Sequence, residues 1–359
     1  MACILGLALA AGGLLDADAR SPSSIRVWPI VYRSWDGHRR RAFVVLPSWY
    51  GPRNHPPVPL VISPHGRGVK ARNNVHFWGD LPAVGRFAVV NPEGQGRRLT
   101  LYSWGAPGEI SDLARMPAIV RQALPWLHID PHRIYAIGGS MGGQETLLLV
   151  ARHPHLLAGA ISFDANTDMA LRYRDFALVP AERRLRRLAR LEIGGTPRTA
   201  NAAFRQRSPL AQVCAIASSD VPLEVWWSTR DRIVLDQARN SEALLDGIRA
   251  VDPDAPVVGV AGTWKHTAEM WYFRRLPAAL ASIGLLPARG AHSLPRSGIT
   301  ELAAGRVSGT PSDRMSPVQP DRRPVGRGRP ARGGRPSGYV FAARSGSAAP
   351  PVPHARCSR

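Results

Sequence analysis

One short stretch, Gly138-Gly139-Ser140-Met141-Gly142, constrains the fold of this chain more than any other. The apolar run 133–137 precedes it and is typical of a buried strand, whereas the leucine-rich run 143–152 follows it and is typical of a helix. Glycines on both sides of Ser140 allow neighbouring backbone to pass without a Cβ clash. The stretch therefore predicts a strand, a sharp turn that presents a serine, and a helix.

Short apolar runs recur along the chain and predict the rest of an α/β sheet. The turn dipeptide Asp36-Gly37 lies between two β-rich runs, which predicts a β-hairpin. Further strands are expected at 59–63, 87–90, 133–137, 159–163, 223–227 and 257–260. A helical stretch at 110–127 and the helix after Ser140 separate some of these strands. This alternation predicts a mostly parallel central sheet with helices on both faces.

Composition divides the chain into three parts. Residues 1–25 begin with an apolar run that is too short to span a bilayer but fits the core of a signal peptide, with Ala17-Asp18-Ala19 as a cleavage site. This predicts secretion, with a cytoplasmic location as the alternative because a positively charged start is missing. Residues 26–287 hold the predicted sheet. Residues 288–359 are rich in Arg, Pro, Gly and Ser, and predict a disordered tail.

Nearly sixty residues separate the sixth predicted strand, 159–163, from the next one at 223–227. A segment of this length exceeds an ordinary connection in an α/β sheet. It predicts a small insertion after the sixth strand. The insertion either caps a pocket or decorates the surface.

The net charge of +21 raises the question of a nucleic-acid partner. Only Lys70 and Lys265 are lysine, so arginine makes up almost all of the basic residues. Residues 288–359 contain thirteen arginines and three acidic residues. No aromatic side chain lies within the Arg-Gly runs of this segment. We therefore expect no nucleic-acid partner, and an RNA-binding tail is the alternative.

The three cysteines, Cys3, Cys214 and Cys357, lie far apart in the sequence. This spacing supports neither a disulfide framework nor a zinc cluster. Cys214, within the predicted sheet domain, is expected to be a small buried residue.

A serine hydroxyl becomes a good nucleophile when a base removes its proton and a third group orients that base. On an open α/β sheet these groups lie on loops at the carboxyl ends of strands. For the third group, Asp231 follows the strand at 223–227. Asp164 is the alternative, and Asp236 lies farther into the next predicted helix. The other reading of Asp231 is a surface ion pair with a neighbouring arginine.

Among eleven histidines, His266 combines a late position with a loop that follows a predicted strand. The order Ser140, Asp231, His266 is that of a catalytic triad on an open α/β sheet. A negatively charged intermediate also needs two hydrogen-bond donors. We expect the backbone N–H of Met141 and that of Arg67, with Gly66 as the alternative to Arg67. The other reading of residues 64–68 is simply a tight turn.

Five stretches resemble the α/β-hydrolase serine esterases related to prolyl oligopeptidase catalytic domains, feruloyl and acetylxylan esterases, and polyhydroxybutyrate depolymerases. They are PHGRG at 64–68, DPHRIYAIGGSMGG at 130–143, RSPL at 207–210, WWSTRDRIV at 226–234 and GTWKHT at 262–267. The resemblance spans about residues 26–287. It implies the α/β-hydrolase fold and hydrolysis through an acyl-enzyme, without a metal or an organic cofactor.

We therefore expect a serine hydrolase that cleaves small-molecule or polymeric carboxylic esters. The sequence given has no N-terminal region of β-propeller size, which favours an esterase over a dedicated oligopeptidase. A peptidase or an acyltransferase with the same triad is the alternative. Trp104 and Trp264 are candidates for an aromatic wall beside the substrate, and core packing is the other reading for each.

Overall fold

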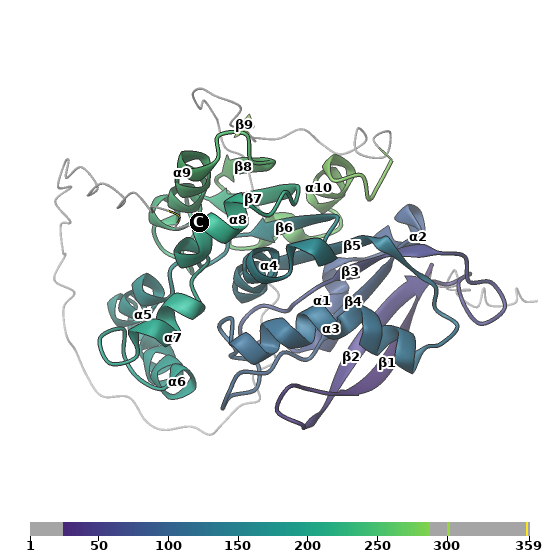
Figure 1. Cartoon of the computed structure of the whole chain (residues 1–359), viewed down its shortest axis with the longest axis horizontal. Coiled ribbons are helices and arrows are strands. Elements are labelled where there is room, and N and C mark those ends of the chain that lie inside the picture. Colours follow the sequence, from purple (N-terminus) through teal and green to yellow (C-terminus); the bar gives the residue numbers. More distant parts are fainter. Residues whose placement is uncertain (1–23, 288–299, 302–356, 358–359) are drawn as a thin grey trace, which may run out of the picture.

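A nine-stranded sheet forms the centre of the molecule (Figure 1). The computed structural model describes residues 24–287, 300–301 and 357. The strands lie in the order β1-β2-β4-β3-β5-β6-β7-β8-β9. They are β1 (Ile25–Arg33), β2 (Arg39–Pro47), β3 (Val58–Ile62), β4 (Ala88–Pro92), β5 (Ile129–Gly139), β6 (Gly159–Phe163), β7 (Leu223–Ser228), β8 (Val257–Gly262) and β9 (Thr300–Glu301).

Parallel pairing holds from β4 through β3, β5, β6 and β7 to β8. β1 and β2 form the predicted hairpin, and β2 joins β4 in antiparallel pairing. Every residue of β3, β4 and β6 is buried, because helices cover both faces of these central strands. This burial explains their uninterrupted apolar sequences. The mostly parallel sheet predicted from the sequence is confirmed.

The helices lie on both faces of the sheet (Figure 1). The α-helices are α1 (Ala71–Asn74), α2 (Leu81–Gly85), α3 (Pro107–Ala123), α4 (Met141–Arg152), α5 (Met169–Leu178), α6 (Arg183–Ile193), α7 (Asn201–Gln206), α8 (Val213–Ala217), α9 (Ser241–Val251) and α10 (Leu276–Ser282). Short 3₁₀ turns are η1 (Val75–Phe77), η2 (Pro154–Leu156), η3 (Pro180–Glu182), η4 (Pro209–Gln212), η5 (Gln237–Arg239) and η6 (Ala268–Met270). No described helix has both the length and the apolar character needed to cross a membrane.

Two apolar clusters cover the two faces of the sheet. One contains Leu113 of α3, Leu147 of α4 and Ile248 of α9, all buried against the strands. The other contains Leu81 of α2 and Leu280 of α10. Burial of apolar area on both faces makes the sheet a rigid frame for the loops at its carboxyl edge.

The insertion predicted after the sixth strand extends from the end of β6 to the start of β7 and contains α5, α6, α7 and α8. A third apolar cluster joins Phe176 of α5 and Ile193 of α6 to Trp104 and Met141. Met141 directly follows Ser140, so the insertion packs against the turn that carries the serine. This position favours the capping interpretation over surface decoration.

The structure corrects our prediction for the cysteines, because Cys214 and Cys357 form a disulfide. Cys214, at the start of α8, is only partly buried. The sequence separation of 143 residues gave no sign of this proximity. Cys357 belongs to the segment for which we predicted disorder, as do Thr300 and Glu301, which pair with β8. The predicted signal segment, up to residue 23, and the remainder of 288–359 lie outside the described residues.

The disulfide predicts a cross-linked peptide pair and a measurable contribution to stability. Non-reducing digestion of the oxidised protein should yield the Cys214 peptide joined to the Cys357 peptide. Cys357→Ser should lower the free energy of unfolding in urea by about 2–5 kcal/mol, because the cross-link restricts the unfolded chain. Cys214→Ser should lower stability by the same amount, because it removes the same cross-link. Free thiols at both positions after oxidative refolding would contradict the assignment.

Candidate active site

Ser140 lies on a sharp turn between β5 and α4. Its φ of 60° and ψ of −122° are unfavourable for a residue with a side chain. Gly142 is required here because a Cβ on it would lie 2.2 Å from the carbonyl oxygen of Pro64. A Cβ on Gly138 would lie 2.5 Å from the backbone of Gly142. The two glycines thus allow the β3 loop, β5 and the start of α4 to approach closely around the serine.

Two backbone N–H groups flank the serine. The Met141 N–H is at the first position of α4, and neither it nor the Arg67 N–H finds an acceptor among the described residues. A Cβ on Gly66 would lie 3.9 Å from the Ser140 Cβ, which places the loop that carries Arg67 beside the serine. Unsatisfied N–H groups at a helix start favour a negative charge. They are the two N–H groups that the sequence analysis named as oxyanion donors, and that function stays a prediction.

His65 holds the Arg67 loop in place. Its ring is buried, and its Nε2 accepts a hydrogen bond from the Gly94 N–H at 2.9 Å. Nδ1 therefore carries the proton and donates to the Gly66 carbonyl oxygen at 2.8 Å. Burial lowers the pKa of His65, which stabilises this neutral form. His65 thus has a structural function in the loop next to Ser140.

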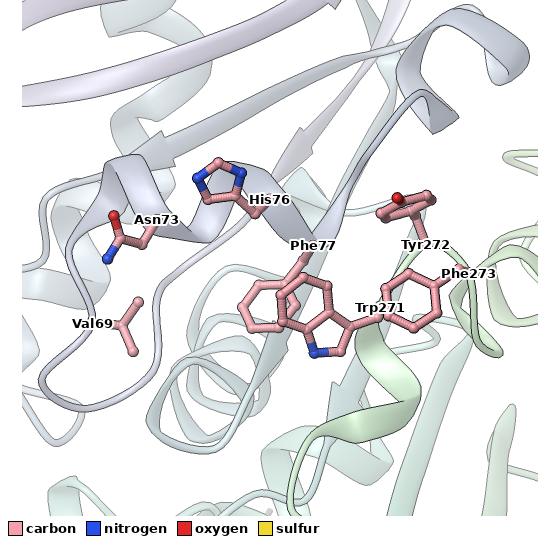
Figure 2. A pocket seen from close by; sticks show the side chains of 7 residues that line it. All are labelled: Val69, Asn73, His76, Phe77, Trp271, Tyr272 and Phe273. Atoms are coloured by element: carbon pink, nitrogen blue, oxygen red, sulfur yellow. The ribbon is translucent and has the colours of Figure 1, made fainter. Parts of the chain in front are cut away.

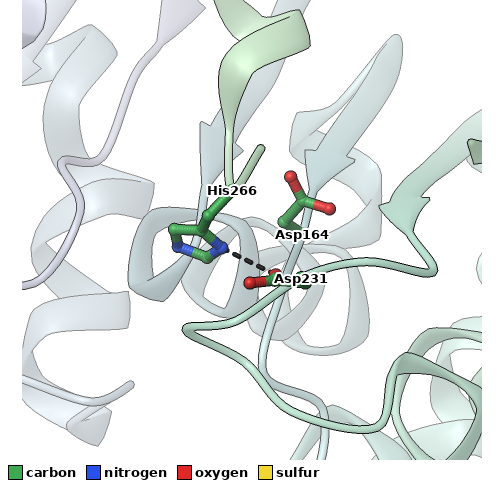
Figure 3. Close-up of side chains that lie close together, drawn as sticks. All are labelled: Asp164, Asp231 and His266. Carbon is green, nitrogen blue, oxygen red and sulfur yellow. Dashed lines mark hydrogen bonds and ion pairs between the residues drawn. The ribbon is translucent and has the colours of Figure 1, made fainter. Parts of the chain in front are cut away.

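His266 and Asp231 form the pair that the sequence predicted (Figure 3). His266 Nδ1 lies 2.7 Å from Asp231 Oδ2. Asp231 Oδ1 accepts the backbone N–H groups of Ile233 and Val234 at 2.8 and 3.1 Å. Burial alone would raise the pKa of Asp231, but the hydrogen bond and charge of His266 lower it below its usual value. The ionised carboxylate therefore keeps the Nδ1 proton of His266 directed toward it.

The histidine loop touches the turn of the serine. A Cβ on Gly139 would lie 3.0 Å from Thr267 Cγ2, so the neighbours of Ser140 and His266 are in contact. Within the described residues the Ser140 hydroxyl makes no hydrogen bond. Nδ1 of His266 is engaged by Asp231, which leaves Nε2 as the ring atom available to the serine. A hydrogen bond between His266 Nε2 and the Ser140 hydroxyl therefore stays a prediction.

Asp164, the alternative acid, links the two loops that carry Asp231 and His266. It is fully buried at the end of β6 with a φ of 45°. Its Oδ1 accepts the Ser228 N–H at 2.7 Å, and its Oδ2 accepts Trp264 Nε1 at 3.0 Å and the Thr267 N–H at 2.6 Å. Burial raises the pKa of Asp164 to about 6, although the charge of His266 acts in the opposite direction and lowers it. Asp164 therefore joins strand-end loops instead of bonding directly to the imidazole.

The cluster of Asp164, Asp231 and His266 brings possible metal ligands within 4.8 Å of one another. All four carboxylate oxygens, however, already accept hydrogen bonds from N–H groups or from the imidazole. A cation at this position would face those donors at close range. The donor set therefore suits an orienting carboxylate pair and does not suit a metal ion.

The insertion is also bound to the Arg67 loop. Arg67 Nη2 and Arg172 Nη2 both donate to Glu182 Oε1 at 3.2 Å. The guanidinium of Arg172 lies over the ring of Phe176, 4.4 Å from its centroid. Because Glu182 is shared by the two arginines, it connects the insertion to the loop with the candidate donor N–H.

The two tryptophans that we named as a substrate wall have other surroundings. Trp104 is buried, and its backbone N–H lies 3.3 Å from Met141 Sδ. Trp264 is half-buried, and it donates to Asp164. Both therefore have packing or hydrogen-bonding functions, and a contact with substrate stays a prediction for each. A groove that the sequence analysis missed is lined by the aromatic run 271–273 and by Phe77 (Figure 2).

The raised pKa of Asp164 predicts how stability depends on pH. The carboxyl binds its proton more tightly in the folded state, at a pKa of about 6, than at the reference value of 3.8. The free energy of unfolding should therefore fall as the pH rises from about 4 to 6, by about 3 kcal/mol from this group. Asp164→Asn should remove this contribution, which urea titrations at pH 4 and pH 7 will measure. Equal pH dependence in both proteins would contradict it.

The comparisons with known proteins agree with this geometry. Residues 109–246 match the model of the prolyl oligopeptidase family. No curated protein sequence is significantly similar to the chain. The sequence match includes the Ser140 turn and Asp231 but not His266.

Solved structures share the fold at low sequence identity. An acylaminoacyl peptidase from Pyrococcus horikoshii has a TM-score of 0.53 and 16% identity over 68% of this chain, which spans only 38% of that protein. An S-formylglutathione hydrolase from Staphylococcus aureus has a TM-score of 0.51 and 15% identity, covering 73% of this chain and 98% of that one. A structure of fungal esterases from Rhizomucor miehei has a TM-score of 0.56 and 13% identity. The match covers 73% of this chain and 83% of that one. These matches confirm the predicted fold and the resemblance: the chain has the α/β-hydrolase fold and contains a region that matches the prolyl oligopeptidase family.

Proposed function

We propose that the chain is a serine hydrolase that cleaves carboxylic esters through an acyl-enzyme. The observation that carries this proposal is the convergence of three features at one turn. Ser140 lies on a strained turn, the Met141 and Arg67 N–H groups near it have no acceptor, and the His266–Asp231 pair joins the two neighbouring loops. This combination of a nucleophile, a base and oxyanion donors is typical of acyl transfer.

The proposed reaction has two steps. His266 Nε2 takes the proton of Ser140 as its Oγ attacks the ester carbonyl, and the Met141 and Arg67 N–H groups bind the negative oxygen that forms. The C–O bond to the alcohol then breaks, and His266 gives its proton to the leaving oxygen. A water molecule, deprotonated by His266, attacks the acyl-enzyme and releases the acid and Ser140. Asp231 holds the imidazole in the required tautomer and stabilises its charged form.

We favour ester over peptide cleavage, and the printed names of two similar structures support this choice. The S-formylglutathione hydrolase and the fungal esterases match over 98% and 83% of their own chains. The acylaminoacyl peptidase matches over only 38% of its chain. A peptidase or an acyltransferase would use the same residues and would differ in the leaving group or acceptor. We further infer an oxidising compartment, which the Cys214–Cys357 disulfide supports.

Ser140→Ala should reduce kcat on p-nitrophenyl acetate by roughly 10³-fold or more while the protein stays folded, because the nucleophile is lost. A fluorophosphonate probe should label Ser140 in the parent and nothing in the variant. Aminoacyl p-nitroanilides measured in parallel separate esterase from peptidase activity. Ester hydrolysis by the variant within tenfold of the parent would contradict the proposal.

Asp231→Asn should reduce kcat by roughly 10⁴-fold, because the amide no longer fixes the reactive tautomer of His266. Asp164→Asn keeps one acceptor oxygen and does not touch the imidazole, so it should cause a much smaller loss. Circular dichroism of both variants controls for folding. The opposite ranking in steady-state assays would assign the orienting carboxylate to Asp164.

A further inference from the structure

An aromatic groove of about 610 Å³ opens between two segments of the chain (Figure 2). Its wall on one side comes from the loop after His266, and its wall on the other comes from the Arg67 loop, α1 and η1. The lining residues are Val69, Asn73, His76, Phe77, Trp271, Tyr272 and Phe273. None of our sequence-predicted site residues lines this groove.

Both walls of the groove begin at residues that touch the serine turn. A Cβ on Gly66 would lie 3.7 Å from Val69 Cγ2 and 3.9 Å from Ser140 Cβ, so this glycine separates the groove from the nucleophile. On the other wall, Met270 Sδ would lie 2.9 Å from a Cβ on Gly139, and Trp271 follows directly. The groove therefore lies between the segments that follow Arg67 and His266, both of which contact the serine turn.

The aromatic side chains of the groove pack against one another, yet some remain accessible. Trp271 packs edge-on against Phe77 with ring centroids 4.7 Å apart, and the Tyr272 N–H donates to the Phe77 carbonyl oxygen at 2.8 Å. Tyr272 and Phe273 are nevertheless 37% and 46% exposed. Fixed aromatic rings that face solvent offer apolar area at little entropic cost and commonly mark a ligand site.

The chemistry of the lining defines the ligand. Four of the seven lining residues are aromatic, and the described lining contains no carboxylate, arginine or lysine side chain. Apart from His76, no lining side chain could pair with a charged ligand, which would lose hydration in the groove. A flat, uncharged ring could instead pack against Trp271 and Phe273 by stacked or edge-on contacts.

The place of the groove identifies which half of an ester it receives. In the proposed reaction the leaving oxygen takes its proton from His266, so the alcohol half must lie next to the histidine loop. Trp271 and Phe273 belong to that same loop. On the other side of the serine turn, Met141, Trp104 and Phe176 already fill the space with buried side chains.

We propose that this groove is a subsite for the alcohol half of the substrate and that it takes an uncharged aromatic ring. The inference rests on the proposed ester hydrolysis and adds the class of leaving group. Because binding of the ring stabilises the transition state of acylation, it should raise kcat/KM for esters that carry the ring on the alcohol.

A series of esters tests this subsite. Propyl, benzyl and 2-naphthylmethyl acetates share one acyl group and have primary alkanol leaving groups of similar acidity. We expect kcat/KM to rise by roughly tenfold or more from propyl to the aryl esters, as burial of a ring permits. Propyl phenylacetate, with the ring on the acyl half, should show no comparable gain. Equal kcat/KM for all three acetates, or the larger gain for propyl phenylacetate, would overturn the inference.

Phe273→Ala should remove most of the aryl preference and leave propyl acetate hydrolysis within about twofold, because Phe273 contacts none of the proposed catalytic residues. Trp49→Ala is the matched control, since Trp49 is a comparably exposed aromatic residue that lies outside the groove. The control should keep the aryl preference. An aryl preference that survives Phe273→Ala unchanged would contradict the assignment of the groove.

Binding of 2-naphthylmethanol to the Ser140→Ala variant separates this inference from the proposed function. Saturable quenching of tryptophan fluorescence that weakens at least fivefold with the added Phe273→Ala change supports the subsite without any turnover. If the protein hydrolyses no ester but this binding remains, the proposed function fails and the subsite stands. Absence of saturable binding would overturn the subsite even if propyl acetate is hydrolysed.

Discussion

The close approach of three backbone segments around Ser140 is the constraint on which the rest of the site depends. Gly142 lies so near the Pro64 carbonyl that any side chain would clash, and Gly138 lies equally near Gly142. This packing forces Ser140 into its positive φ and aligns the start of α4 with the Arg67 loop. The strain at Ser140 is sustained because the buried strands on either side leave the turn no other path. The same contacts bring the loop that carries the Arg67 N–H to the serine turn, where the Met141 N–H begins α4.

A second set of contacts makes the histidine side of the site depend on the sheet. Asp164 occupies the end of β6 and accepts N–H groups from Ser228 and Thr267, which lie on the loops of Asp231 and His266. Strand ends in a parallel sheet lie along one edge, so a single buried carboxylate can join two neighbouring loops there. Its burial is costly for the ionised form, which is why the pKa of Asp164 is raised. Positioning of His266 thus involves two acids with different functions.

The sequence allowed prediction of those features that depend on local pattern. The runs around Ser140, Asp231 and His266 identified strand ends, and the parallel sheet brings Asp231 and His266 together as expected. Local pattern did not distinguish a carboxylate that bonds to the imidazole from one that joins loops, since Asp164 and Asp231 both follow strands. It also gave no sign of the Cys214–Cys357 disulfide, because a proximity between such distant residues depends on the path of the chain.

The aromatic groove is another feature that local sequence pattern did not reveal. It also suggests which half of the substrate determines specificity. The run Trp271-Tyr272-Phe273 is visible in the sequence, but its exposure depends on how the loop after His266 returns to η1. On the insertion side, Phe176 and Met141 are packed into a core cluster and leave little accessible apolar surface. Because the exposed rings of Tyr272 and Phe273 lie on the loop after His266, our proposal makes the leaving alcohol the part of the ester that is selected. The sheet thus fixes the geometry around Ser140, and in our proposal the loop after His266 provides the specificity.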